Sequence, residues 1–305
     1  SEMCIRDRSI DGPPEINDKT RIFKNGEGTS EVVIQNIKKL RNNDIKTGVI
    51  VVVNRYNYDK MQNVASFLIH ELGIRRLKAN PVDPFGLAIQ NWKEIGISAD
   101  QYFIAMRDLF EYLIEYNREH PDRPVTEDNL GFLLLNILTK ERLYMCMRNP
   151  CGAALELLSF DPTGNIYPCD HLMIEELCLG NIRDVDDLSF LEDNVLRKKL
   201  LERTLDNIPQ CALCPYKCIC HGGCTARAFA ETGRLLERSE FFCQYFKLIV
   251  KYIFKRIIQD KDSVKLLIEP LLKSIYQEDE LEAVSYTHLR AHETEADLVC
   301  RLLLE

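Results

Sequence analysis

The chain has 305 residues, 46% of them hydrophobic, and a formal net charge of −8 at pH 7. This length can bury a substantial core and allows one or two domains. The acidic balance argues against a non-specific nucleic-acid-binding surface. The most apolar helical stretch, residues 241–258, is interrupted by four basic side chains, so we expect no contact with a membrane.

The twelve cysteines are the next compositional signal. Disulfide frameworks belong to small secreted domains, whereas this chain has an ordinary apolar fraction and no recognisable signal peptide. We therefore expect a soluble protein of the reducing cytoplasm.

Both ends of the chain look foreign to the rest. Residues 1–8 and 284–305 resemble translated sequencing-adapter sequence of the kind found at the edges of metagenomic gene predictions. We exclude them from fold reasoning, so Cys4 and Cys300 receive no role. An ordinary frayed terminus and a short C-terminal helix are the alternative, and they too would leave both cysteines without function.

The first part of the chain alternates strand-like and helix-like segments. Residues 9–12 indicate a strand end, and Ser30 is a candidate N-cap for a helix. Residues 47–53 form a continuous β-branched run, typical of a strand buried on both faces of a parallel sheet. A helix that stops at Gly73 and a strand over 74–78 follow. This order predicts an α/β fold with a parallel sheet.

The middle of the chain is predicted to be largely helical. Residues 81–98 are rich in Pro and Gly and indicate a loop. Helices are expected over 99–116 and 126–138, and residues 140–150 lead into the cysteine-rich region. The charge-rich run 197–203 predicts a solvated helix face.

Seven cysteines in the second half of the chain follow a distinctive spacing. One tetrahedral site consumes four thiolates, so a cysteine-only set of this length indicates more than one soft-metal centre. A Cys-x2-Cys turn lets two thiolates approach one centre, and Pro215 follows it as in ferredoxin motifs. The spacing is Cys151, Gly164-x4-Cys169, Cys211-x2-Cys214-x5-Cys220-x3-Cys224 and Cys243.

This spacing, the hairpin-like segment 159–169 and the Cys220-His-Gly-Gly-Cys224 turn resemble the SPASM domain of radical S-adenosylmethionine (SAM) enzymes. The closest type is the anaerobic sulfatase-maturating enzyme. The preceding part, with its Ser-Ile-Asp-Gly-Pro strand end, more weakly resembles the second half of the radical-SAM barrel. The implied fold is the second half of a partial (β/α)6 barrel over 9–140 and a mostly α, cysteine-rich SPASM domain with a small β-hairpin over 141–250. C-terminal helices over 251–283 complete the implied organisation.

The resemblance implies two auxiliary [4Fe-4S] clusters. The second cysteine set, which would hold one of them, is Cys211, Cys214, Cys220 and Cys243. The first cysteine set would hold the other and consists of Cys151, Cys169 and Cys224, with Cys146 as the fourth ligand. If Cys146 is merely a buried thiol, the first cluster has an open iron that could bind substrate; we favour full ligation.

Other assignments of the cysteines stay open. Two Cys4 zinc sites could staple the region, because thiolates suit zinc as well as iron. Cys178 and Cys218 fall outside the pattern, and we expect small buried hydrophobic side chains there. His171 and His221 lie near the candidate ligand cysteines in the sequence, but their spacing does not indicate that either is a metal ligand.

Three polar residues are further candidates. In the sulfatase-maturating type, a carboxylate at the place of Asp170 is thought to be the general base. Burial beside an anionic cluster should raise its pKa, which suits a base; the alternative is a turn residue that bonds backbone amides. Ser9 and Asn54 lie at predicted strand ends and could contact SAM, although such residues are commonly just caps.

By resemblance, the intact enzyme would cleave SAM at a third [4Fe-4S] cluster, abstract a hydrogen atom from a peptide or protein substrate and pass an electron to the auxiliary clusters. Its reductant would be a flavodoxin or ferredoxin. The favoured reaction is oxidation of Cys or Ser to formylglycine on a sulfatase, and a ribosomal-peptide crosslink or cyclisation is the alternative.

The C-x3-C-x2-C loop for the third cluster is missing from this sequence, so we expect a C-terminal fragment that is inactive alone. Alternatives of another class are a non-catalytic iron-sulfur electron-transfer module and a zinc-stapled binding protein.

Overall fold

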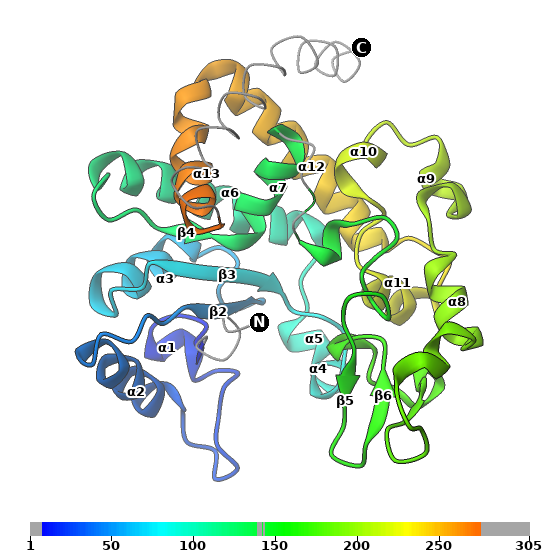
Figure 1. Ribbon diagram of the computed structural model, residues 1–305. Coiled ribbons are helices and arrows are strands. Elements are labelled where there is room, and N and C mark those ends of the chain that lie inside the picture. The colour runs from blue at the N-terminus through cyan, green and yellow to red at the C-terminus, as the bar shows by residue number, and fades with distance from the viewer. Residues whose placement is uncertain (1–7, 139–141, 143, 276–305) are drawn as a thin grey trace. The chain divides into compact units, whose positions relative to one another are not determined.

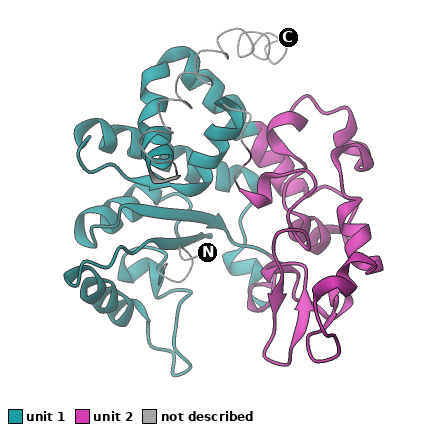
Figure 2. Ribbon diagram, viewed as in Figure 1, with its two compact units in different colours: residues 1–83, 90–140, 248–305 teal, residues 84–89, 141–247 magenta. Residues whose placement is uncertain are grey.

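The computed structural model describes residues 8–138, 142 and 144–275 (Figure 1). The adapter-like residues 1–7 and 284–305, with Cys4 and Cys300, lie outside this part of the chain. Two compact units divide the chain (Figure 2). Unit 1 takes residues 1–83, 90–140 and 248–305, and unit 2 takes residues 84–89 and 141–247.

Unit 1 contains a four-stranded, wholly parallel sheet, which confirms the α/β prediction. Its strands follow the order β1-β2-β3-β4, and the central pair aligns Val49 with Leu77. The buried residues of β2 alternate with half-buried ones, so the expectation of a strand fully buried on both faces was wrong. The bounds are β1 Arg8–Ser9, β2 Val49–Val53, β3 Arg76–Pro81 and β4 Thr126–Glu127.

Long amphipathic helices accompany this sheet, because apolar side chains recur at helical spacing. The longest, α6, begins at a capping box in which Ser98 and Gln101 exchange hydrogen bonds, and it buries Leu109 and Leu113. It packs against α3 and α13. The main helices of unit 1 are α2 Ser30–Asn42, α3 Met61–Ser66 with a π-helical continuation over Phe67–Glu71, α6 Ala99–Glu119, α7 Asp128–Leu138 and α13 Lys261–Ile275. Helix α12 Glu240–Gln259 begins in unit 2 and ends in unit 1. Of the four-residue helices, α1 Pro14–Asn17 and α5 Trp92–Ile95 belong to unit 1, whereas α4 Leu87–Gln90 lies almost wholly in unit 2.

Several predicted bounds were wrong. The N-cap of α2 is Thr29; Ser30 lies inside the helix, where its hydroxyl donates to Asp18. Residue Thr126 belongs to β4, because pairing with Arg76 extends the sheet before α7 begins. The third strand starts two residues later than expected, and the predicted loop 81–98 contains α4 and α5.

Unit 2 is built from short elements. The predicted hairpin is present: β5 (Ser159–Phe160) and β6 (Asn165–Tyr167) are antiparallel, and β7 (Gly180–Asn181) extends them. Asp161 closes the hairpin turn by accepting hydrogen bonds from the backbone amides of Thr163 and Asn165. The helices are α8 Val195–Leu201, α9 Pro209–Ala212, α10 Lys217–Cys220 and α11 Thr225–Thr232, with 3-10 turns at Met145–Met147, Asp170–Leu172, Glu175–Leu177, Leu188–Glu192 and Leu205–Asn207.

The described residues of unit 2 include two buried apolar clusters. The larger gathers aliphatic residues such as Ile166, Leu172 and Leu200, whereas the smaller consists of Leu205, Ile208 and Cys211. The prediction of a solvated helix face over 197–203 was wrong at Leu200 and Arg203, which are both buried. None of the described helices combines the length and apolar composition needed to cross a lipid bilayer.

Candidate functional site

The second cysteine set lines one pocket of unit 2. Cys211 lies in α9, Cys214 in the turn after it, Cys220 at the end of α10 and Cys243 in the first turns of α12. Burial, together with a smaller effect of the other three thiols, raises the pKa of Cys220 to about 12. Burial also raises the pKa of Cys211. The fold thus brings four sulfurs from three helices and a turn to one place.

The pocket carries the thiol groups that soft metals prefer as ligands. The raised pKa values keep these thiols protonated at neutral pH, so binding a metal would require them to release protons. Arg238 and Lys247 line the same pocket and add positive charge, while Leu205 and Phe246 make part of its wall apolar. These residues fit an iron-sulfur cluster. Within the part of the chain that is described, no three His, Cys, Asp or Glu side chains form a site for a single metal ion.

Members of the first cysteine set gather against the larger apolar cluster of unit 2. Cys151, Cys169 and Cys224 all pack on it. Burial, together with smaller effects of the nearby Asp170 and Cys151, raises the pKa of Cys169 to about 12. The structure therefore places these three cysteines in one neighbourhood; their role as ligands stays a prediction.

Tyr144 connects Cys146 with this neighbourhood, and sequence reasoning missed it. Burial raises the pKa of the Tyr144 hydroxyl, and Cys146, Cys224 and Asp170 each raise it further. Tyr144 therefore lies within electrostatic reach of Cys146 and of a member of the first set. No motif marks a lone tyrosine as such a neighbour.

Asp170 follows Cys169 and begins a 3-10 turn. Its Oδ1 accepts a hydrogen bond from the His171 backbone amide at 3.0 Å and lies 3.1 Å from His171 Nδ1. The His171 side chain is the main reason that the pKa of Asp170 is lowered. The side chain is 69% exposed and its charged form is hydrogen-bonded, which agrees with the lowered pKa. The upward shift expected beside an anionic cluster stays a prediction. The geometry matches the turn role that we weighed as the alternative.

The remaining cysteines and His221 occupy separate environments. Cys218 is exposed, so the prediction of a buried side chain was wrong there. Cys178 is half-buried, and its thiol donates to the Gly180 carbonyl. His221 has left-handed backbone and accepts a hydrogen bond from Arg142 Nε at 2.7 Å. Burial and the Arg142 charge lower the pKa of His221 to about 4, so its ring is neutral at pH 7.

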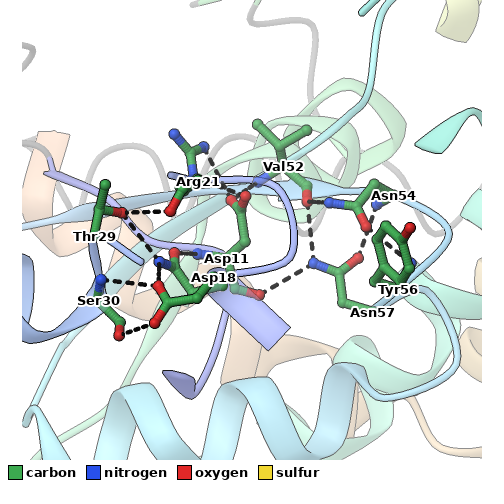
Figure 3. A network of polar contacts seen from close by, with 10 residues as sticks. Asp11, Asp18, Arg21, Thr29, Ser30, Val52, Asn54, Tyr56 and Asn57 are labelled. Carbon is green, nitrogen blue, oxygen red and sulfur yellow. Dashed lines mark hydrogen bonds and ion pairs between the residues drawn. The ribbon is translucent and has the colours of Figure 1, made fainter. Parts of the chain in front are cut away.

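The two candidate SAM contacts lie in unit 1. Ser9 is an exposed residue of β1. Asn54 directly follows β2 and is buried; its Oδ1 accepts from the Tyr56 amide at 2.9 Å, and its Nδ2 donates to the Val52 carbonyl at 3.3 Å (Figure 3). Asn54 therefore acts as a turn cap in this structure, and a contact with SAM stays a prediction for both residues.

A polar network ties the ends of β1 and β2 together (Figure 3). Asp11 binds Arg21 through both carboxylate oxygens, at 2.7 and 3.0 Å, and accepts from the Val52 amide at 2.8 Å. Asn57 donates to the carbonyls of Asp11 and Val52. These hydrogen bonds connect the segment after β1 to β2 and so stabilise this edge of the sheet.

Comparison with known proteins identifies relatives for most of the chain, although no protein-family model matches it. The cysteine-type anaerobic sulfatase-maturating enzyme of Clostridium novyi is 24% identical over 217 residues, which cover 71% of this chain and 56% of the relative. The serine-type enzyme of Bacteroides thetaiotaomicron is 24% identical over 260 residues, which cover 80% and 62%. The chain thus spans little more than half the length of these relatives.

Solved structures show the same fold. The chain matches native anSMEcpe with bound AdoMet at a TM-score of 0.71 and 21% identity, over 85% of this chain and 69% of that one. A second structure of that protein, with bound AdoMet and the Cp18Cys peptide, matches equally well. The chain is therefore similar to radical SAM sulfatase-maturating enzymes, which confirms the predicted resemblance.

Proposed function

We propose that this sulfatase-maturase-like chain is the C-terminal part of a radical SAM/SPASM enzyme that modifies a peptide or protein side chain. The observation that carries the proposal is the convergence of Cys211, Cys214, Cys220 and Cys243 on one pocket. With the first cysteine set, that pocket accounts for two auxiliary [4Fe-4S] clusters. When bound, such clusters supply one-electron transfer.

The substrate class follows from the relatives. Their names include both a cysteine-type and a serine-type sulfatase-maturating enzyme, and one solved structure holds a peptide. We therefore favour oxidation of a Cys or Ser side chain to formylglycine on a sulfatase. A flavodoxin or ferredoxin would be the reductant, and SAM with a third [4Fe-4S] cluster would complete the intact enzyme.

Unit 1 would contribute the SAM side of the reaction. Its parallel sheet would be the second half of a partial (β/α)6 barrel, with SAM near Ser9 and Asn54. The hydrogen-bonded network around Asp11 supports this assignment, because such a network can hold the polar groups of a binding edge in position for a ligand.

The test uses the longer protein that contains this chain and a C-x3-C-x2-C loop, purified without oxygen. Sulfatase peptides with Cys or Ser at the reacting position are incubated with SAM and a reductant, and mass spectrometry detects the aldehyde. We expect formylglycine from at least one peptide. A crosslinked or cyclised peptide would favour the ribosomal-peptide alternative instead, and zinc without iron in the purified protein would favour the binding protein.

Asp170→Asn tests the proposed base. The amide replaces a residue that is not a cluster ligand, so iron content should be unchanged, whereas formylglycine should form about 10²-fold more slowly. SAM cleavage should continue and leave uncoupled 5′-deoxyadenosine. The matched control is His171→Gln, which removes the imidazole that contacts Asp170. If Asp170→Asn formed product at the normal rate, Asp170 would be a turn residue and not the general base.

A further inference from the structure

Unit 2 buries two arginines, and their surroundings differ. Arg203 and Arg227 are each only 2% exposed. Arg227 is paired with Glu231 at 3.0 Å, and its guanidinium lies 3.6 Å from the centre of the Phe241 ring. Arg203 forms no ion pair with a carboxylate anywhere in the described chain; its three side-chain hydrogen bonds go to backbone carbonyls. A buried charge without a counter-charge is strongly unfavourable, so Arg203 requires a different anion.

Two of the three carbonyls that Arg203 binds lie in the turn between Cys220 and Cys224. Its Nη2 donates to Gly222 at 3.1 Å and to Glu237 at 2.9 Å, and Nη1 reaches Gly223 at 3.4 Å. Gly222 and Gly223 have left-handed backbone, which glycine adopts without strain. They form the turn between Cys220 of the second cysteine set and Cys224 of the first. Arg203 therefore fixes the segment that links the two sets.

The same guanidinium lies within electrostatic reach of both sets. Burial lowers the pKa of Arg203, whereas Cys151 and Cys224 of the first set, and Cys211 and Cys220 of the second, oppose that shift. Its Nε is buried and has no hydrogen-bond partner. A guanidinium presents five donors, so an unused buried N–H is a donor available to a further acceptor.

We propose that Arg203 is a positioning residue shared by the two proposed clusters: it holds the Cys220–Cys224 turn and supplies the positive charge that both anionic groups require. The inference rests on the proposed function, since the clusters are the missing anions. A cation beside a thiolate-ligated cluster stabilises the reduced form more than the oxidised form, because reduction adds negative charge. Arg203 should therefore raise both reduction potentials.

The experiment is an anaerobic redox titration of the full chain with reconstituted clusters, followed by electron paramagnetic resonance. Arg203→Gln, which removes the charge, should shift both potentials to more negative values. Arg203→Lys retains the charge, so its two reduction potentials should lie closer to the wild-type values than those of Arg203→Gln do. Arg227→Gln is the matched control: it removes an equally buried arginine that already has a carboxylate partner, and should leave both potentials unchanged.

Iron and sulfide analysis covers the case in which the Arg203→Gln variant does not incorporate the clusters. Loss of iron in Arg203→Gln with retention in Arg203→Lys supports the counter-charge role, whereas equal loss in both overturns it. Unchanged potentials in a fully loaded Arg203→Gln protein also overturn it and leave the proposed function intact. Wild-type chain that binds no iron and sulfide contradicts the proposed function itself.

Discussion

The two units are stabilised in different ways. Unit 1 has a parallel sheet and a 21-residue helix whose side chains Leu109 and Leu113 are fully buried. In unit 2 the strands are two or three residues long, many turns are 3-10, and one of its apolar clusters has three members. Apolar burial is the main favourable term in folding, so a region built from short elements gains from any further source of stability. If its cysteines hold the proposed clusters, we expect unit 2 to depend on those clusters for part of its stability.

The largest effect expected from this contrast is that of Cys220→Ser. A serine hydroxyl does not replace a thiolate ligand, so the second cysteine set would lose its cluster and the chain about half of its iron. Since metal binding contributes directly to folding, unit 2 should become sensitive to protease while unit 1 stays protected. Iron analysis and mass-spectrometric mapping of the cleavage sites measure both outcomes.

Cys178→Ser is the matched control for that variant. Cys178 lies in unit 2 but belongs to neither cysteine set, and its thiol donates a hydrogen bond to the Gly180 carbonyl. Its replacement should leave iron content and protease resistance unchanged. Equal iron content in Cys220→Ser and Cys178→Ser would refute the dependence of unit 2 on its cysteines.

Sequence patterns predicted the regular parts of the chain best. The run at 47–53 and the periodicity at 99–116 gave a strand and a helix close to their observed bounds, because local pattern and tertiary packing agree there. Thr126 and Glu127 looked helical, but pairing with Arg76 and Leu77 places them in β4. Such pairing is a long-range interaction that local propensity does not contain.

The candidate site was predictable only as far as its cysteines. Their spacing indicated more than one soft-metal centre, and the resemblance implied the two sets. The structure brings the second set to one pocket. Arg203 lies in a charged run typical of a solvated helix, yet it is buried, because its partners are carbonyls of residues distant in sequence. The pKa of Asp170 is lowered mainly by its neighbour His171, whereas the upward shift expected beside a bound cluster stays a prediction. Side-chain environments of this kind depend on tertiary contacts.

A smaller effect should appear in unit 1, where Glu127 is buried in β4. Burial raises its pKa from the ordinary 4.5 to about 7, although it accepts hydrogen bonds from the amides of Ala79 and Leu130. Between these values the folded chain holds a proton that the unfolded chain releases, so stability falls as pH rises through this window and is constant above it. The loss is on the order of 3 kcal/mol at most.

Denaturant unfolding of unit 1 at about pH 5 and about pH 8 measures this loss. Glu127→Gln is the control, because an amide does not titrate, and its stability should vary less over the same window. If the free energy of unfolding varied with pH in the same way in the wild type and in Glu127→Gln, Glu127 would not be the group responsible for that variation.

The smallest effect is expected from the removal of a helix N-cap. The same change can be made once in each unit, so it compares the two units directly. In unit 1, the Ser98 hydroxyl accepts from the Gln101 amide at 3.2 Å at the start of α6. In unit 2, the Asn194 side chain accepts from the Arg197 amide at 2.9 Å at the start of α8. Replacement of either residue by Ala should cost about 1 kcal/mol, because each removes one cap.

The consequences should nevertheless differ. Helix α6 is long and packed on two other helices, so Ser98→Ala should lower the unfolding midpoint of unit 1 slightly and leave iron retention unchanged. Helix α8 has seven residues and ends two residues before Arg203, so fraying caused by Asn194→Ala should loosen the guanidinium that fixes the Cys220–Cys224 turn. Iron should then be lost faster to a chelator. If a chelator removed iron from the two variants at the same rate, the cysteines of unit 2 would be held in place without help from α8. The stability of unit 2 would then depend less on its short elements than we expect.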